Sequence, residues 1–361
     1  MRRRAGVRGA DGSRRMRPGD DGRRRTRVRR VLIGLVGALL AIVAALLAAG
    51  FAATWFITRQ VEARYPPAGR RVALAGGALA VLEAGPGEGR PSRGTVVLLH
   101  GASANGMDPM QAFGRRLAGD GFRVLAFDRP GFGWSDRIAG SAAASPAVQA
   151  RLIAEALGAL AVGPATIVGH SWSGALAATL ALDHPERVSG LVLLAPALYP
   201  WPGGAVPGYA GWYRSVPGRA LLALATHTVA APLGLSYLDR FAAAVFRPDP
   251  LPPGYVDEAR VPLVLRPATF LANLQDLDGL YGFLAAQSPR YPEIAVPTTI
   301  VAGDADPVVR TPVHAEPMAR AVPGARLVVL PGIGHMLHYT ATDAVVAEIE
   351  AVAARGRVAA D

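Results

Sequence analysis

The 361-residue sequence predicts an α/β fold in which a doubly wound, mostly parallel sheet follows one N-terminal transmembrane helix. Six short runs of apolar and β-branched residues recur from residue 95 onward, and such continuous runs are typical of strands buried on both faces. Stretches with helical character separate several runs, and this alternation indicates a parallel sheet with helices on both faces. The six runs are residues 95–100, 123–128, 165–170, 188–196, 297–304 and 325–332.

An antiparallel hairpin is expected ahead of these strands. Two apolar runs within residues 71–84 flank a pair of glycines, which is a hairpin signal. The folded domain is therefore predicted to begin near Arg71, after a linker of residues 59–70 whose "YPPAG" segment breaks regular structure. The glycine-rich segment at residues 85–89 leads into a strand and not a helix, so we interpret it as a loop and not as a dinucleotide-binding turn.

The alternation is interrupted between the fourth and fifth runs by helical pieces and proline-rich breaks. A structureless loop of that length would be improbable in a compact domain. We therefore expect an inserted helical cap at residues 197–296, with the α/β core made of residues 71–196 and 297–361. Aromatic residues of the cap are candidates for the substrate entrance, with ordinary packing as the alternative: Trp201, Tyr209, Trp212 and Tyr213.

The N-terminal region predicts a membrane anchor. Residues 31–58 contain no charged side chain and are long enough for a helix to cross a bilayer. Many arginines precede this segment in the basic tail, residues 1–30, and few follow it closely. We therefore expect a cytoplasmic tail, and the folded domain on the outer side of the cell membrane. Export followed by cleavage of a signal sequence is the alternative, although the apolar run is longer than a typical signal core.

Composition excludes several kinds of chemistry. The net charge of +11 belongs almost entirely to residues 1–30, which hold thirteen arginines and three aspartates, so no nucleic-acid partner is expected for the nearly neutral remainder. The sequence contains neither lysine nor cysteine. Schiff-base catalysis, a Walker A lysine, disulfides and thiolate nucleophiles are therefore excluded, and no cofactor or metal is expected.

The segment "IVGHSWSG" at residues 167–174 places Ser171 in a turn between a predicted strand and an alanine-rich helix. This is the setting of a nucleophile elbow, in which a tight turn holds the hydroxyl clear of the sheet. The usual motif has glycine at its fifth position, but here that position is Ser173 and the glycine follows at Gly174. We expect this departure to alter the packing of the turn and not its chemistry. A purely structural turn serine is the alternative.

A serine nucleophile needs a base that takes its proton and a carboxylate that orients the base. Asp306 follows one predicted strand and His335 follows the next, which gives the chain order serine, aspartate, histidine known for nucleophile elbows. Three loops at the carboxyl ends of parallel strands can converge at one edge of the sheet. Asp304 is the rival acid. His335 and His338 also have HxxH spacing, but one such pair is a weak metal signal.

Acyl transfer also needs backbone N–H groups placed where negative charge develops on the carbonyl oxygen. Trp172 follows the candidate nucleophile and offers one such amide. The turn "LLHGASANG" after an earlier strand offers the second, from Ala102. Ala102 and Trp172 are therefore the predicted oxyanion hole, whereas His100 and His170 are expected to support the two turns.

Taken together, residues 71–355 resemble the α/β-hydrolase superfamily, and within it the branch with a helical cap inserted after the sixth strand. The resemblance rests on "HG" in "LLHGASANG", "AFDRPGFGWSD", "GHSWSG", "GDADPVV" and "GIGH", in the expected order. It implies Ser171 as nucleophile, His335 as base and Asp306 as the orienting acid. Relatives that use an aspartate nucleophile, such as haloalkane dehalogenases and epoxide hydrolases, are excluded by the serine.

The predicted function is hydrolysis of a carboxylic ester by a membrane-anchored serine hydrolase, through an acyl-enzyme on Ser171. The expected partner is a small-molecule ester of apolar character. Acyltransferases, perhydrolases and carbon–carbon bond hydrolases use the same triad, and they stay open as alternatives. A non-catalytic exported binding protein is a further alternative, for which a broken triad would be the sign.

Overall fold

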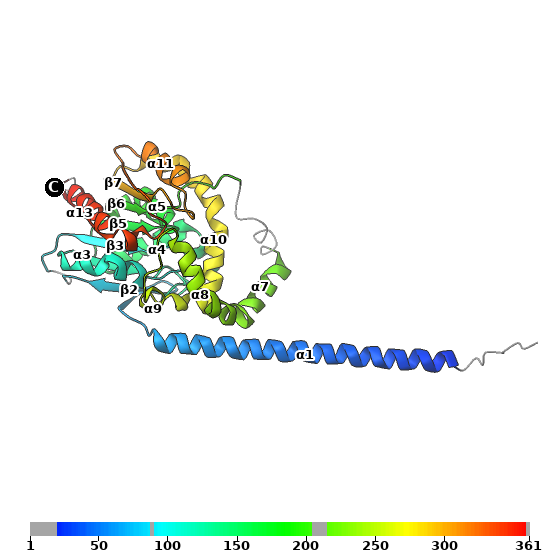
Figure 1. The fold of residues 1–361 in the computed structure, drawn as a ribbon. Coiled ribbons are helices and arrows are strands. Elements are labelled where there is room, and N and C mark those ends of the chain that lie inside the picture. Colours follow the sequence, from blue (N-terminus) through cyan, green and yellow to red (C-terminus); the bar gives the residue numbers. More distant parts are fainter. Residues whose placement is uncertain (1–19, 87–89, 204–214, 359–361) are drawn as a thin grey trace, which may run out of the picture. The chain divides into compact units, whose positions relative to one another are not determined.

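The computed structural model describes residues 20–86, 90–203 and 215–358, with side chains described from residue 23 onward (Figure 1). The chain divides into two compact units, Met1–Ala49 and Gly50–Asp361. Most of the basic tail predicted from the sequence, residues 1–19, lies outside the described residues.

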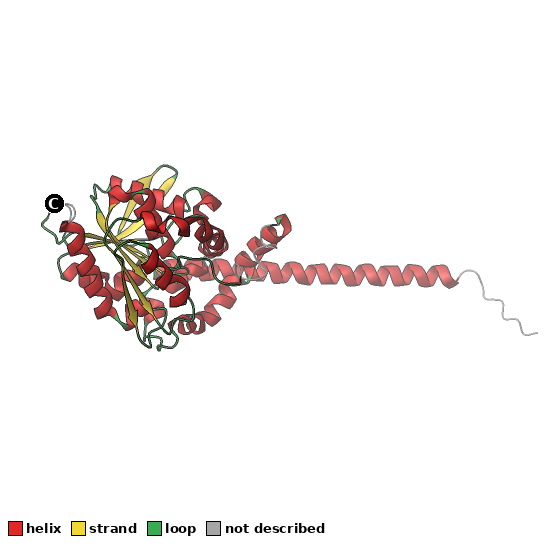
Figure 2. Ribbon diagram, turned by 90° about the horizontal axis from the view of Figure 1, so that it is seen from above, coloured by secondary structure: helices red, strands yellow, loops and turns green. Residues whose placement is uncertain are grey.

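An eight-stranded sheet forms the centre of the second unit, in the order β1-β2-β4-β3-β5-β6-β7-β8 (Figure 2). β1 and β2 are the predicted hairpin, β2 also runs antiparallel to β4, and all other neighbours are parallel. The predicted fold class, a mostly parallel sheet, is confirmed. The strands are Arg70–Leu74 (β1), Gly77–Ala84 (β2), Thr95–Leu99 (β3), Arg123–Phe127 (β4), Ala165–His170 (β5), Val188–Leu194 (β6), Thr298–Gly303 (β7) and Arg326–Leu330 (β8).

Helices cover both faces of the sheet, and each face has its own buried apolar cluster. Neighbouring residues of one strand pack in opposite clusters, as Val96 and Val97 of β3 do. This explains why the parallel strands read as uninterrupted apolar runs in the sequence. The first cluster includes residues of α4 (Pro146–Ala159), α5 (Ser173–Asp183) and α11 (Thr311–Ala321), and the second includes residues of α3 (Arg115–Gly119) and α13 (Thr342–Val358).

The insertion between β6 and β7 is helical. Its longest helix, α10, buries Leu280 and Leu284 in the same cluster as α4 and α5, so the cap is joined to the core through an apolar contact. Helix α8 packs through Ala231 and Leu238 in a smaller cluster of its own. The described cap helices are α7 (Val216–Thr228), α8 (Ala230–Phe246), α9 (Tyr255–Glu258) and α10 (Pro267–Gln287).

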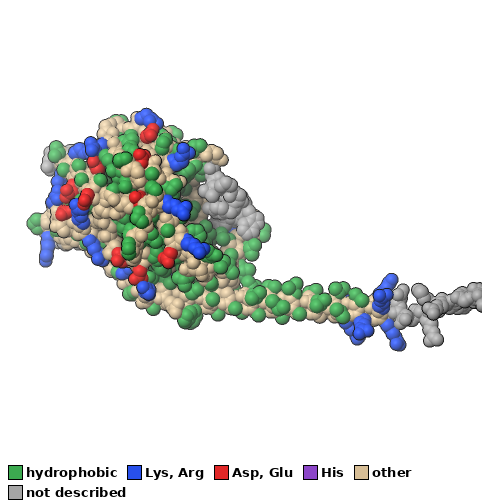
Figure 3. All heavy atoms as spheres, in the orientation of Figure 1, with side chains coloured by type: hydrophobic (Ala, Val, Ile, Leu, Met, Phe, Trp, Pro, Cys, Tyr) green, Lys and Arg blue, Asp and Glu red, His purple; other side chains and the backbone are tan. Residues whose placement is uncertain are grey.

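Helix α1 (Asp20–Arg64) contains the predicted anchor. Figure 3 shows hydrophobic side chains along its length and arginines towards its N-terminal end. Among the described residues it is the only single helix long and apolar enough to cross a membrane. Helices α7 and α8 together are also long and apolar enough, but a bend of 71° separates them. Helix α1 is therefore a candidate membrane span.

The helix does not end at residue 58, where the sequence placed the end of the anchor. Residues 59–64, which the sequence assigned to the linker, continue α1 as far as Arg64. The segment Tyr65-Pro66 follows, and proline both lacks an amide hydrogen and disfavours helical backbone in the residue before it. The non-helical linker is therefore shorter than expected, and β1 begins at Arg70.

A buried histidine lies beside the first cap aromatic. Trp201 meets His314 edge-on, with ring centroids 4.6 Å apart, so it packs within the protein and is not among the described residues that line the pocket around Ser171. His314 is fully buried, and its Nδ1 accepts hydrogen bonds from the amides of Leu198 and Tyr199 at 3.3 and 3.2 Å. The imidazole must therefore be neutral. The other three cap aromatics, Tyr209, Trp212 and Tyr213, lie outside the described residues.

Because of His314, the free energy of unfolding is expected to fall as the pH is lowered from about 6.5 to about 4. Burial lowers its pKa from 6.5 to about 4, so between these values the unfolded chain takes up a proton that the folded chain does not. The free energy of unfolding should decrease by about 3 kcal/mol across that window and change no further through this group above it. Denaturant unfolding at both ends of the window compares wild-type protein with His314→Asn, whose Oδ1 accepts hydrogen bonds at any pH. The free energy of unfolding should decrease less in the variant. An equal decrease would contradict the role given to His314.

Candidate active site

Ser171 lies in the sharp turn between β5 and α5. Its φ is 55°, a backbone conformation that residues other than glycine rarely adopt and that a tight turn imposes. Its amide donates to the carbonyl oxygen of Leu194 at 2.9 Å, and its own carbonyl accepts from the amide of Ala197 at 3.0 Å. The end of the neighbouring strand β6 therefore holds the strained turn in place.

The irregular fifth position of the elbow motif has a structural explanation. The hydroxyl of buried Ser173 donates to the carbonyl oxygen of His100 at 2.5 Å. A Cβ at Gly174 would lie 2.5 Å from the Cβ of Pro196, and a Cβ at Gly169 would lie 2.4 Å from the carbonyl oxygen of Ser173. The turn thus requires glycine at 169 and 174, whereas a serine at 173 is accommodated because its hydroxyl finds an acceptor.

The three predicted catalytic residues lie in hydrogen-bond contact. Nε2 of His335 lies 2.9 Å from Oγ of Ser171, and Nδ1 of His335 lies 2.8 Å from Oδ2 of Asp306. His335 and Asp306 are both buried. An imidazole that donates from Nδ1 to Asp306 has a free lone pair on Nε2, which can accept the proton of the serine hydroxyl. The arrangement can therefore activate Ser171 as a nucleophile.

The geometry also separates the two candidate acids. Asp306 accepts two hydrogen bonds from amides of its own loop through Oδ1, at 2.7 and 2.9 Å, which leaves Oδ2 for His335. Asp304 is exposed and accepts from the amide of Gly332 at 2.6 Å. Asp304 therefore holds the loop after β8 and does not reach the base.

Ala102 and Trp172 lie on the two turns next to Ser171. Ala102 lines the same pocket as Ser171, and Trp172 immediately precedes α5, where the helix dipole favours negative charge. The indole Nε1 of buried Trp172 donates to the carbonyl oxygen of Asp276 at 3.0 Å, which fixes the residue in place. Within the described residues, neither backbone amide donates to a backbone carbonyl in a turn or loop contact. Their part in an oxyanion hole stays a prediction.

A fully buried ion pair lies next to the site, in contact with the residues around Ser171. Nη1 of Arg129 lies 2.5 Å from Oδ2 of Asp276, and both side chains are shielded from solvent. Asp276, on cap helix α10, also accepts from Arg137 at 2.8 Å and from Gln149 at 3.0 Å. Burial lowers the pKa of Arg129 to about 10, so the guanidinium is still charged at neutral pH and the carboxylate compensates it.

Arg129 connects the parts of the site to one another. It donates to the carbonyl oxygens of His100 and Gly101, both at 3.2 Å, and its guanidinium lies 4.1 Å from the ring centroid of Trp172. One side chain thus contacts the turn at His100 and Gly101, the elbow at Trp172 and, through Asp276, the cap. Sequence reasoning missed this role, although Arg129 stands in the "AFDRPGFGWSD" motif.

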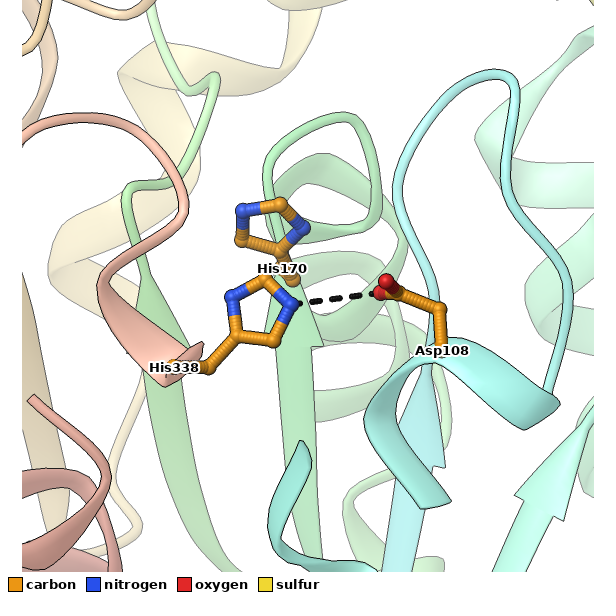
Figure 4. Close-up of side chains that lie close together, drawn as sticks. All are labelled: Asp108, His170 and His338. Atoms are coloured by element: carbon orange, nitrogen blue, oxygen red, sulfur yellow. Dashed lines mark hydrogen bonds and ion pairs between the residues drawn. The ribbon is translucent and has the colours of Figure 1, made fainter. Parts of the chain in front are cut away.

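A second buried cluster consists of Asp108, His170 and His338 (Figure 4). Nε2 of His338 lies 3.2 Å from Oδ2 of Asp108, and the hydroxyl of Tyr255 donates to Oδ1 of Asp108 at 3.2 Å. Burial and the neighbouring imidazoles lower the pKa of His170 well below its usual value, so neutral His170 donates through Nε2 to the carbonyl oxygen of His335 at 3.2 Å. His170 therefore supports the loop that carries His335.

The same cluster is the one candidate metal site among the described residues, because its ligand atoms lie within 4.8 Å of one another. We expect chelation to leave activity unchanged within about twofold, since both oxygens of Asp108 already have hydrogen-bond donors and Nε2 of His335 lies in hydrogen-bond contact with Ser171 without a metal. The measurement is ester turnover before and after dialysis against EDTA. A loss that zinc or another divalent cation restores would identify the cluster as a metal centre.

An apolar pocket of about 440 Å³ lies at the triad, which is a volume typical of small-molecule sites. One side is formed by the core, with Ala102, Ser171 and His335, and the other by cap helix α8, with Leu238 and Phe241. No arginine is found among the described residues that line it. The pocket therefore suits an uncharged, apolar acyl group.

Comparisons with known proteins agree with this geometry. The family model described as the alpha/beta hydrolase fold matches residues 94–342. A 2-hydroxy-6-oxononadienedioate/2-hydroxy-6-oxononatrienedioate hydrolase of Burkholderia vietnamiensis is 41% identical over 102 residues, which are 27% of this chain and 35% of the relative. A 2-hydroxymuconate semialdehyde hydrolase of Pseudomonas putida is 38% identical over 111 residues, 30% of this chain and 37% of the relative. The chain thus spans about a third of the length of these curated relatives.

Solved structures match over a longer part of the chain. The enol-lactonase of Burkholderia xenovorans LB400 has a TM-score of 0.61 at 20% identity, covering 78% of this chain and 99% of its own, and this shows the shared fold. A membrane phospholipase A, described as a bacterial virulence factor, is 25% identical with a TM-score of 0.58 and covers 89% of this chain and 99% of its own.

Proposed function

Because the chain belongs to the α/β-hydrolase family, we propose that it is a membrane-anchored serine hydrolase that cleaves a carboxylic ester through an acyl-enzyme intermediate. The observation that carries the proposal is the hydrogen-bonded series Ser171, His335 and Asp306 beside an apolar pocket. A structural serine would need neither the strained turn nor the base directed at its hydroxyl.

The reaction follows from the contacts. Oγ of Ser171 attacks the ester carbonyl carbon while Nε2 of His335 takes its proton, and the carbonyl electron pair moves to the oxygen, where the amides of Ala102 and Trp172 donate. Collapse of this intermediate breaks the ester C–O bond, and His335 protonates the departing alcohol. Water then gives a proton to His335 and attacks the acyl carbonyl carbon. The bond from this carbon to Oγ of Ser171 breaks, and His335 returns the proton to Oγ as the acid leaves. Asp306 stays ionised and stabilises the imidazolium.

The anchor in this proposal is α1, with its tail in the cytoplasm and the catalytic domain outside. The uncharged residues 31–58 and the arginines before them support it, as does the likeness to a membrane phospholipase A over most of the chain. Protease added to cells whose outer barrier has been opened should digest the domain and spare the tail. A domain that resists until the membrane is dissolved would contradict this orientation, and a soluble exported domain would indicate signal cleavage.

Carbon–carbon bond hydrolysis is the second candidate, favoured by the names of the two curated relatives. Their substrates, a dienedioate and a muconate semialdehyde, carry carboxylates, which proteins usually pair with arginine. The lining described here offers no arginine and is largely apolar, which supports the ester. The relatives also match only part of this chain.

One assay series separates the candidates. We expect wild-type protein to hydrolyse chromogenic esters, with a rate that depends on acyl length because the pocket is of limited volume. A much higher kcat/KM for 2-hydroxymuconate semialdehyde than for any ester would contradict ester hydrolysis as the main activity. Added alcohols test acyl transfer, since a hydrolase yields mainly free acid and an acyltransferase yields new ester.

A further inference from the structure

We propose that the exposed apolar face of cap helices α7 and α8 lies in the boundary layer of the membrane, and that the substrate enters the pocket from that layer. This inference rests on the proposed function and names its substrate class, which is the fatty-acyl ester of a bilayer lipid. It is carried by three observations: where apolar side chains are exposed, what the end of α1 contacts, and which helix forms the pocket rim.

Exposed apolar side chains are concentrated on these two helices. Among the described residues after α1, twelve large hydrophobic side chains are exposed, and eight of them fall between Val216 and Val245. Single exposed apolar residues are normal on soluble proteins, but a group confined to one surface marks an interaction site. The eight are Val216, Leu221, Val229, Leu233, Leu235, Tyr237, Phe241 and Val245.

The end of α1 packs against the same helices. A Cβ at Gly50 would lie 2.9 Å from the carbonyl oxygen of Thr228, so the backbone of α1 approaches the end of α7 closely. Phe51 lies beside His227, with ring centroids 6.2 Å apart, and Ile57 packs on the apolar cluster of α8. These contacts all lie within the second unit.

Those α1 residues belong to the last turns of the uncharged segment 31–58. About 20 helical residues cross the hydrocarbon layer, so residues 50–58 fall at its outer boundary. Trp55 and Phe56 there are exposed, as expected for aromatic residues at a membrane interface. Since α7 and α8 contact α1 at this level, their exposed apolar face meets the bilayer boundary as well.

Helix α8 joins this face to the active site. Leu233, Tyr237, Phe241 and Val245 are spaced four residues apart and form one exposed stripe. Phe241 and Val245 also line the pocket that contains Ser171. The rim of the pocket is thus part of the exposed apolar face, and an acyl chain leaving the bilayer would pass from one apolar surface to another without entering water.

The charges on the two helices suit a lipid surface. The segment from Val216 to Phe246 contains Arg219, Asp239 and Arg240 as its charged residues. Two arginines beside an apolar face are typical of interfacial helices, where they contact lipid phosphates. A bilayer is therefore the occupant that the position, the apolar face and the charges favour together.

A fluorescent label tests the location directly. The chain has no cysteine, so Leu233→Cys or the control Val358→Cys provides the only labelling site for a nitrobenzoxadiazole dye. In vesicles of phosphatidylethanolamine and phosphatidylglycerol, we expect full-length protein labelled at 233 to emit at shorter wavelength and to be quenched by doxyl-labelled lipid, and protein labelled at 358 to show neither effect. Water-exposed emission at 233 would overturn the proposal. A blue shift without lipid quenching would do so too, and would indicate contact with a second copy.

Enzyme activity provides a second test of the membrane-facing cap. The double variant Leu221→Glu, Leu233→Glu places two negative charges on the exposed apolar face of α7 and α8. These two residues are 52% and 57% exposed, and neither lines the pocket. We expect turnover of a soluble short-chain ester to stay within about twofold, and turnover of lipid in vesicles to fall about tenfold or more. The control Val358→Glu should change neither rate.

The outcomes distinguish the two proposals. If wild-type protein fails on both esters and lipid, the proposed function is wrong. If it hydrolyses the soluble ester but the double variant cleaves vesicle lipid as fast as wild type does, the function stands and the membrane-facing cap is overturned.

Discussion

Ser171→Ala is expected to lower kcat for ester hydrolysis by about four to six orders of magnitude, with little change in the free energy of unfolding. The hydroxyl is the group that forms the covalent bond to the acyl carbon, and it lies 2.9 Å from Nε2 of His335, which takes its proton. Steady-state kinetics on a chromogenic ester, with thermal unfolding alongside, measures both quantities.

Ser173→Ala is the matched control, since it removes a hydroxyl from the same turn. Ser173 bonds to the carbonyl oxygen of His100 and does not contact the base, so we expect its loss to lower the rate by less than about tenfold through altered packing. Equal losses in the two variants would mean that the elbow fails by distortion and would contradict the specific role of Ser171.

Asp276→Asn is expected to lower the free energy of unfolding by about 3 to 5 kcal/mol. The substitution keeps the shape of the side chain but leaves the fully buried guanidinium of Arg129 without a countercharge. Because Arg129 also contacts Trp172 and the turn at His100 and Gly101, ester turnover should fall as well. Denaturant unfolding of detergent-solubilised protein measures the loss.

The exposed carboxylate Asp239 on α8 provides the comparison for this buried pair. Asp239→Asn should change stability by less than about 0.5 kcal/mol, as surface substitutions usually do. If Asp276→Asn were equally mild, the buried ion pair would not be holding the cap to the core.

Much of the fold and the central triad follow from the sequence because their signals are local. Each parallel strand is buried on both faces and therefore appears as a continuous apolar run, as Val96 and Val97 on opposite sides of β3 illustrate. Ser171, Asp306 and His335 each follow a strand, and the parallel sheet brings such positions to one edge. Their spacing in the chain predicts their meeting in space.

The remaining contacts have no local signal. Asp276 lies 147 residues from Arg129, and His338 lies 230 residues from Asp108, so nothing near one partner in the sequence identifies the other. Helix α1 extends beyond residue 58, the predicted end of the anchor, because a helix continues through charged residues until a breaker such as Pro66 stops it.

The most direct test of the proposed catalytic serine is labelling with a fluorophosphonate, which forms a covalent bond to an activated serine. Intact wild-type protein should be labelled at a single residue, and peptide mass spectrometry should place the adduct on Ser171, while Ser171→Ala should take up no label. Folded wild-type protein that stays unlabelled, or labelling that persists in Ser171→Ala, would contradict the assignment of Ser171 as the nucleophile.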